Sequence, residues 1–169
     1  MKPRYLFITV ASVTILSISL FVKFPVKVIY NPSTSAPKGT HLIVNSTIQK
    51  GDYVLSNIPE QARILAEKRR YLPENIPILK PMVAGPWDHI CIKNGRLFIN
   101  GKSIAMLLKQ DSKGRKLVPW TGCRVLYENE LFLLSTYTHL SYDSRYFGPV
   151  TRKLIIGKAI PLWVSDNKN

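Results

Sequence analysis

The sequence predicts a β-rich domain with one soluble helix, preceded by an N-terminal transmembrane helix. Short strand-like segments separated by turn residues recur from residue 26 onward, and only residues 59–72 show a helical pattern. Strands spaced in this way favour a mainly β domain over βαβ units. The longest uncharged run, residues 5–22, comes before all of these segments.

Residues 5–22 are close to the ~20 apolar residues that a helix needs to cross a bilayer. Lys2 and Arg4 precede the run, which is the charge distribution of a cytoplasmic N-terminus. A cleaved signal peptide is the alternative, but such peptides end in small residues, and this run ends in Phe21-Val22. We therefore predict a single-pass anchor over residues 1–23 and a domain over 24–169 on the far side of the membrane.

The chain carries 24 Lys and Arg against 10 Asp and Glu, a net charge of +14. This balance is typical of proteins that bind nucleic acid or anionic membranes. No zinc-finger spacing or RNA-binding aromatic motif accompanies it, so we do not expect nucleic-acid binding. The two cysteines and three histidines show no metal-ligand spacing, so we expect neither a metal nor a cofactor.

In chain order, strands are expected on both sides of residues 31–40 and after a Lys-Gly-Asp turn at 50–52. The helix over 59–72 starts with Pro59, and Ile64, Leu65 and Tyr71 can share its apolar face. Asn-Gly pairs at 94–95 and 100–101 predict tight turns around a strand over 96–99. Further strands are expected within 124–136 and 153–164.

Residues 31–40 read NPSTSAPKGT and contain three consecutive hydroxyl side chains, Ser33, Thr34 and Ser35. The flanking prolines and the glycine make the backbone stiff and bent rather than helical. Such a turn can hold a nucleophile at a fixed angle. The alternative is a polar linker between the anchor and the domain.

Lys80 lies within an apolar segment, residues 76–92, that reads IPILKPMVAGPWDHICI. Burial of a lysine disfavours its charged form and lowers its pKa, as a base acting near neutral pH requires. The alternative is a strand lysine whose amine extends to solvent.

These features, in this order, resemble the type I signal peptidases, which are membrane-bound serine proteases with a Ser/Lys pair, and particularly their conjugative-transfer branch, the TraF type. The sequence SAPKG at 35–39 matches the branch motif S-x-P-x-G, GDYV at 51–54 matches G-D-x-V, and SYDSRYFG at 141–148 matches S-x-D-S-R-Y-F/W-G. The resemblance spans essentially the whole chain and implies an antiparallel, signal-peptidase-like sheet. Pro81 and Trp87 depart from the family pattern, which has arginine and glycine at these positions. The resemblance therefore does not predict the backbone conformation near Lys80.

The resemblance implies that Ser35 is the nucleophile and Lys80 the general base. The oxyanion would be held by the Ser35 N–H and the Ser33 hydroxyl, whereas Thr34 would point away along an extended backbone. Ser141 would orient the Lys80 amine.

Asp143 and Arg145 would form a salt-bridged support below the site. A disulfide between Cys91 and Cys123 requires an oxidising compartment, and two cysteines far apart in sequence do not establish it.

The implied activity is removal of the leader from an exported precursor, most specifically a conjugative pilin, with the catalytic domain in the periplasm and the anchor in the bacterial inner membrane. Some members of the branch are thought to join the new ends of the pilin into a ring. Two alternatives are kept: a general signal peptidase with many clients, and a non-catalytic, basic, membrane-anchored scaffold of a secretion apparatus.

Overall fold

The computed structural model describes residues 4–5, 10, 12–14, 17 and 27–165. The anchor predicted over residues 1–23 lies mostly outside these ranges. Within them, no helix has both the length and the apolar character needed to cross a membrane. The anchor therefore stays a prediction.

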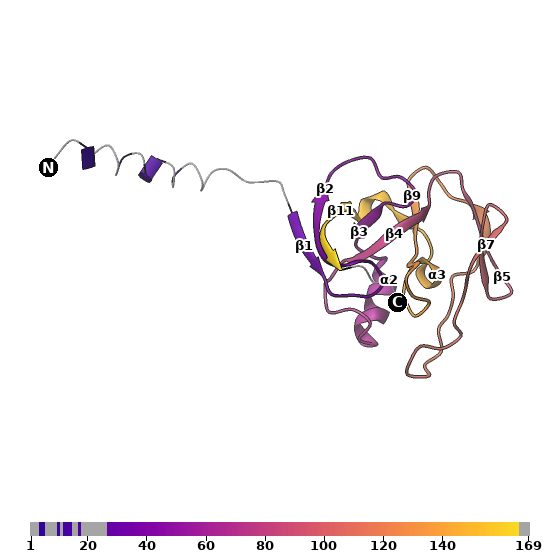
Figure 1. The fold of residues 1–169 in the computed structure, drawn as a ribbon. Helices are drawn as coiled ribbons and strands as arrows, with labels where there is room; N and C mark the ends of the chain where they lie inside the picture. The colour runs from indigo at the N-terminus through magenta and orange to yellow at the C-terminus, as the bar shows by residue number, and fades with distance from the viewer. Residues whose placement is uncertain (1–3, 6–9, 11, 15–16, 18–26, 166–169) are drawn as a thin grey trace.

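The larger sheet has seven strands in the order β1-β2-β11-β3-β4-β9-β10 and is antiparallel throughout. The strand β11 (Ile155–Ser165) lies in its interior, where Lys158 and Ala159 pair with both neighbouring strands. The end of the domain is thereby built into the sheet that carries its beginning (Figure 1). The other strands are β1 (Lys27–Asn31), β2 (Lys38–Val44), β3 (Tyr53–Ser56), β4 (Ile78–Ala84), β9 (Glu130–Leu133) and β10 (Val150–Thr151).

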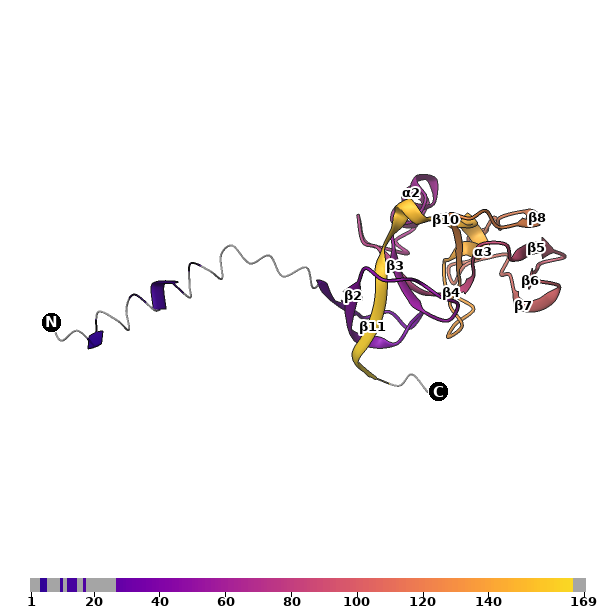
Figure 2. The ribbon, with the colours of Figure 1, turned by 90° about the horizontal axis from the view of Figure 1, so that it is seen from above.

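The smaller sheet has the order β7-β6-β5-β8 and lies at the end of the domain opposite β1 and β2 (Figures 1 and 2). Both Asn-Gly pairs have positive φ, 52° and 69° at residues 94–95 and 49° and 79° at residues 100–101. This confirms the predicted tight turns, whose positive φ angles suit the twist of hairpin strands. The strands are β5 (His89–Lys93), β6 (Arg96–Ile99), β7 (Lys102–Met106) and β8 (Gly122–Val125).

The helix α2 (Glu60–Lys68) begins one residue after the predicted start at Pro59 and packs through a different face from the one predicted. Its buried residues are Ala62 and Ala66, one turn apart, whereas Ile64 is exposed. Both alanines belong to a core cluster that also contains residues of β3, β4 and β9. The predicted use of Ile64 on the packing face is therefore wrong.

The helix also ends before the predicted position, because Arg70 adopts a left-handed conformation with a φ of 58°. The N–H of Tyr71 donates to the carbonyl of Ala66 at 2.8 Å, and the N–H of Arg70 donates to that of Glu67 at 2.9 Å. These two bonds form a Schellman motif, which closes the helix without needing the proline that follows.

Two short helical segments were not predicted: α3 (Ser144–Phe147) and the 3₁₀ helix η1 (Arg152–Leu154). The carboxylate of Asp143 caps α3 by accepting from the N–H of Arg145 at 3.2 Å. A carboxylate is among the favoured N-capping groups, so Asp143 of the SYDSRYFG motif stabilises the start of α3.

The strand β9 lies between two parts of the core. Leu131 and Leu133 pack in the cluster that includes α2, whereas Phe132 and Leu134 belong to the cluster below the smaller sheet. Alternate residues of a strand point to opposite faces, so this continuous apolar run is buried on both sides. Ser135 directly follows this buried run in the sequence.

Candidate active site

The residues after β1 form a tight turn that is held by the side chain of Asn31. The Asn31 amide donates to the carbonyls of Ser33, Ala36 and Pro37 at 3.1, 3.2 and 2.9 Å. Its carbonyl oxygen accepts from the Ser33 N–H at 3.1 Å. Asn31 was not singled out from the sequence, although asparagine before such a turn commonly bonds to the backbone that follows.

Within this turn, the hydroxyls of Ser33 and Ser35 lie 2.8 Å apart. The Ser35 N–H donates to the Ser33 Oγ at 3.2 Å, so the two groups expected to hold an oxyanion are neighbours. Ser35 is buried and Ser33 is exposed. Thr34 is exposed in the turn itself and not in the extended backbone that was expected.

Lys80 lies in the middle of β4, opposite Val54 of β3, and is 6% exposed. Burial lowers the pKa of Lys80 to about 8; the Asp143 carboxylate opposes this effect, and the Arg145 guanidinium adds to it. Its amine makes no hydrogen bond to any of the described residues. Lys80 is therefore a buried lysine and not one that extends into solvent.

The two departures from the family pattern do not interrupt the pairing of β4 with β3, although the pairing of β4 with β9 is irregular between Met82 and Ala84. Pro81 pairs opposite Tyr53, and its carbonyl accepts from the Leu134 N–H at 3.1 Å. Trp87 has a φ of 69°, and its side chain is largely exposed. Trp87 thus adopts the left-handed backbone conformation that is easy for glycine but strained for a bulky residue.

A cavity of about 260 Å³ is lined by Ser33, Ser35, Lys80 and Ser141, which come from three separate parts of the chain. Thr34 also lines this cavity, contrary to the prediction that it points away. The Ser141 hydroxyl is buried and has no hydrogen-bond partner among the described residues. A second, more apolar cavity shares Ser33, Ser35 and Lys80 and continues between β1 and residues 71–79. The structure thus brings together the predicted nucleophile, base and Ser141.

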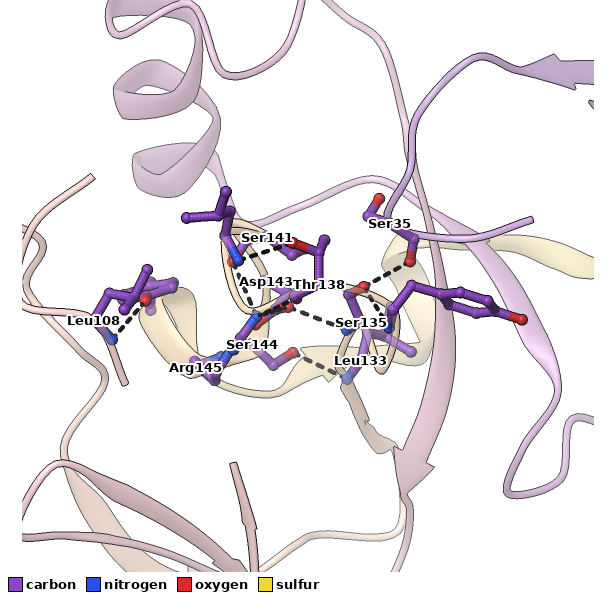
Figure 3. A network of polar contacts seen from close by, with 12 residues as sticks. Ser35, Leu108, Leu133, Ser135, Thr138, Ser141, Asp143, Ser144 and Arg145 are labelled. Atoms are coloured by element: carbon purple, nitrogen blue, oxygen red, sulfur yellow. Dashed lines mark hydrogen bonds and ion pairs between the residues drawn. The ribbon is translucent and has the colours of Figure 1, made fainter. Parts of the chain in front are cut away.

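Asp143 and Arg145 form a buried ion pair next to this cavity, with exposed side-chain fractions of 0% and 1%. The Arg145 Nε and Nη2 atoms donate to the two carboxylate oxygens, each at 2.8 Å (Figure 3). Nη2 also donates to the Ser141 carbonyl at 3.2 Å. The pair therefore fixes the main chain of Ser141, which faces the cavity.

Ser135 was not predicted from the sequence, although this residue contacts the serine turn directly. Its hydroxyl donates to the Ser35 carbonyl at 2.8 Å, and its N–H donates to Asp143 Oδ2 at 3.1 Å (Figure 3). Ser135 follows an apolar strand, 100 residues from Ser35, and belongs to none of the recognised motifs.

Cys91 and Cys123 lie outside this site, opposite each other on β5 and β8, and a disulfide joins them. Among the described residues, no group of three or more His, Cys, Asp or Glu side chains could hold a metal ion.

Comparison with known proteins shows the family of the chain. Residues 2–163 match the model of the family described as signal peptidase, peptidase S26. The chain belongs to this signal peptidase family. The resemblance indicated by the sequence motifs is thereby confirmed.

Three relatives of this signal peptidase chain cover most of its length. The plasmid transfer protein TraF of Escherichia coli is 30% identical over 75% of this chain and 77% of its own. The conjugal transfer protein TraF of Agrobacterium fabrum is 32% identical, over 80% and 82%. Signal peptidase I V of Bacillus subtilis is 27% identical, over 93% and 96%.

Proposed function

We propose that this signal peptidase family member is a serine endopeptidase in which Ser35 is the nucleophile and Lys80 the general base. The observation that carries the proposal is the cavity that Ser35 and Lys80 share, with the lysine buried in an apolar strand. A serine hydroxyl needs a nearby base to remove its proton, and a neutral lysine can supply it.

In the proposed reaction, Lys80 accepts the Ser35 proton while the Ser35 oxygen attacks the scissile carbonyl. The oxyanion accepts hydrogen bonds from the Ser35 N–H and the Ser33 hydroxyl. For this, both groups give up the hydrogen bonds that they make to each other's residue within the turn. Lys80 next protonates the leaving amine, and water or another amine releases the acyl group from Ser35. The unpartnered Ser141 hydroxyl is available to orient the lysine amine.

The proposed substrate is an exported precursor whose leader is removed at the bacterial inner membrane, with the domain in the periplasm. The apolar cavity beside Ser35 suits an extended segment with small apolar side chains. Because two of the relatives above are TraF proteins named for plasmid or conjugal transfer, we propose a conjugative pilin precursor as the client. A general signal peptidase is the second candidate, favoured by the nearly full-length match to signal peptidase I V.

Incubation of the purified full-length protein with the candidate pilin precursor, followed by mass spectrometry, tests this function. Cleavage at one site after a small residue supports it, and a mature product lighter by one water indicates ring closure. No cleavage of this precursor or of any other exported precursor contradicts it. Rescue of a strain that lacks its essential signal peptidase would favour the general peptidase instead.

The pH dependence of cleavage provides a prediction about the base. Only neutral Lys80 can accept a proton, and its pKa is lowered to about 8 by burial. We expect kcat/KM to rise about tenfold per pH unit below this value and to level off above it, roughly 100-fold in all between pH 6 and 9. A flat profile from pH 7 to 9, with the fold intact by circular dichroism, would exclude Lys80 as the base.

A further inference from the structure

Ser135 holds the main chain of the proposed nucleophile. The carbonyls of Ser33, Ala36 and Pro37 are bound by Asn31, which lies in the same segment of the chain. The carbonyl of Ser35 is bound instead by Ser135, which follows β9 and lies 100 residues further along the chain. The hydrogen bond at the Ser35 carbonyl therefore connects the turn to the rest of the site.

The direction of this hydrogen bond follows from the chemistry of its two partners. A carbonyl oxygen can only accept, so the Ser135 hydroxyl is the donor to Ser35. The same hydroxyl oxygen accepts from the Tyr137 N–H at 3.3 Å, which leaves its proton free to point at the Ser35 carbonyl. Ser135 is 5% exposed, so water competes little for this bond.

Ser135 is itself held on both sides by the parts of the site that surround Lys80. The residue before it, Leu134, donates its N–H to the carbonyl of Pro81, the neighbour of Lys80 on β4. The Ser135 N–H donates to Asp143, which the buried ion pair with Arg145 keeps in place. Hydrogen bonds of Leu134 and Ser135 thus connect the serine turn to the lysine strand and to the ion pair. Figure 3 shows the bonds of Ser135 to Ser35 and Asp143.

We propose that Ser135 is a positioning residue, which sets the orientation of Ser35 relative to Lys80 by fixing the Ser35 carbonyl. This inference rests on the proposed function. It gives the buried Asp143–Arg145 pair a role in the reaction, since the pair holds the Ser135 main chain. Proton transfer between a serine and a lysine depends steeply on their geometry, and small displacements of a reacting group can reduce the rate strongly.

The test compares Ser135→Ala with Ser144→Ala in the full-length protein, using cleavage of the pilin precursor. Ser144 is also a buried serine beside β9, where its Oγ accepts from the Leu133 N–H at 3.0 Å, but it has no contact with the serine turn. We expect kcat to fall about 10-fold to 100-fold in Ser135→Ala, with KM changed less than twofold. Ser144→Ala is expected to lower the thermal midpoint to a similar extent while kcat stays within about threefold of wild type.

A second variant, Ser135→Thr, keeps the hydroxyl and is expected to restore kcat to within about fivefold of wild type. Wild-type kcat in Ser135→Ala, equal losses in Ser135→Ala and Ser144→Ala, or a threonine variant as slow as the alanine one would each contradict the proposal. Ser35→Ala is measured alongside. If that variant cleaves at the wild-type rate, the proposed function fails; if it is inactive while Ser135→Ala is normal, only the positioning role fails.

Discussion

Replacing Ser35 with alanine is expected to reduce cleavage of the precursor by about 10⁴-fold or more, because no other group supplies the attacking oxygen in the proposed reaction. The protein should remain folded. The side chain loses one hydroxyl contact, to Ser33, whereas the carbonyl bond to Ser135 and the buried position of Ala36 do not depend on it. Single-turnover cleavage and the thermal midpoint measure the two effects separately.

The matched control for this variant is Thr34→Ala, which removes the neighbouring hydroxyl from the same turn. Thr34 is exposed and lines the same cavity as Ser35, but its side chain makes no hydrogen bond to the described residues. We expect its cleavage rate to stay within about threefold of wild type, as for surface substitutions in general. Equal losses in the two variants would mean that the turn, and not the Ser35 oxygen, is what the reaction needs. Wild-type cleavage by Ser35→Ala would contradict the assignment of Ser35 as the nucleophile, whereas a wild-type protein that cleaves no precursor would support the non-catalytic scaffold.

The sequence predicted those parts of the fold that depend on local chemistry. The Asn-Gly turns were placed correctly because positive φ at two successive residues strongly favours this pair. The end of α2 was placed too late because Arg70, a poor candidate for a left-handed conformation, adopts one as part of a Schellman motif. The helix α3 was missed because four residues are too few to show a helical period.

For the site, the motifs predicted the residues with charged or nucleophilic side chains. The structure places three of them, Ser35, Lys80 and Ser141, around one cavity. The motifs gave no indication of Asn31 and Ser135, which act through backbone carbonyls. An Asn31 amide bound to a turn leaves only a weak local signal. The bond from Ser135 to Ser35 spans 100 residues and follows from the pairing of β4 with β9, which the sequence alone does not provide.

Replacing Lys80 with methionine is expected to change activity and stability in opposite directions. Methionine has a similar length and no proton-accepting amine, so we expect cleavage to fall by about 10³-fold or more. The side chain is buried between apolar residues of β4, where an ammonium group is poorly solvated. We therefore expect the variant to be more stable than the wild type by about 1–2 kcal/mol at pH 7. Precursor cleavage and urea unfolding measure the two effects.

The stability difference should also depend on pH in a direction that the pKa of Lys80 fixes. Its folded-state pKa, about 8, lies below the 10.5 of an exposed lysine, so the unfolded chain binds more protons between these values. The stability of the wild type therefore rises with pH across this window, and the advantage of Lys80→Met is largest below pH 8 and shrinks toward pH 10. The exposed Lys102 on β7 provides the control, because Lys102→Met removes an amine that is not buried. Equal stability of Lys80→Met and wild type at every pH would contradict the burial of Lys80 as an ammonium group. The expected result would mean that Lys80 lowers stability when it is protonated and is needed for cleavage when it is neutral, so that its role is chemical and not structural.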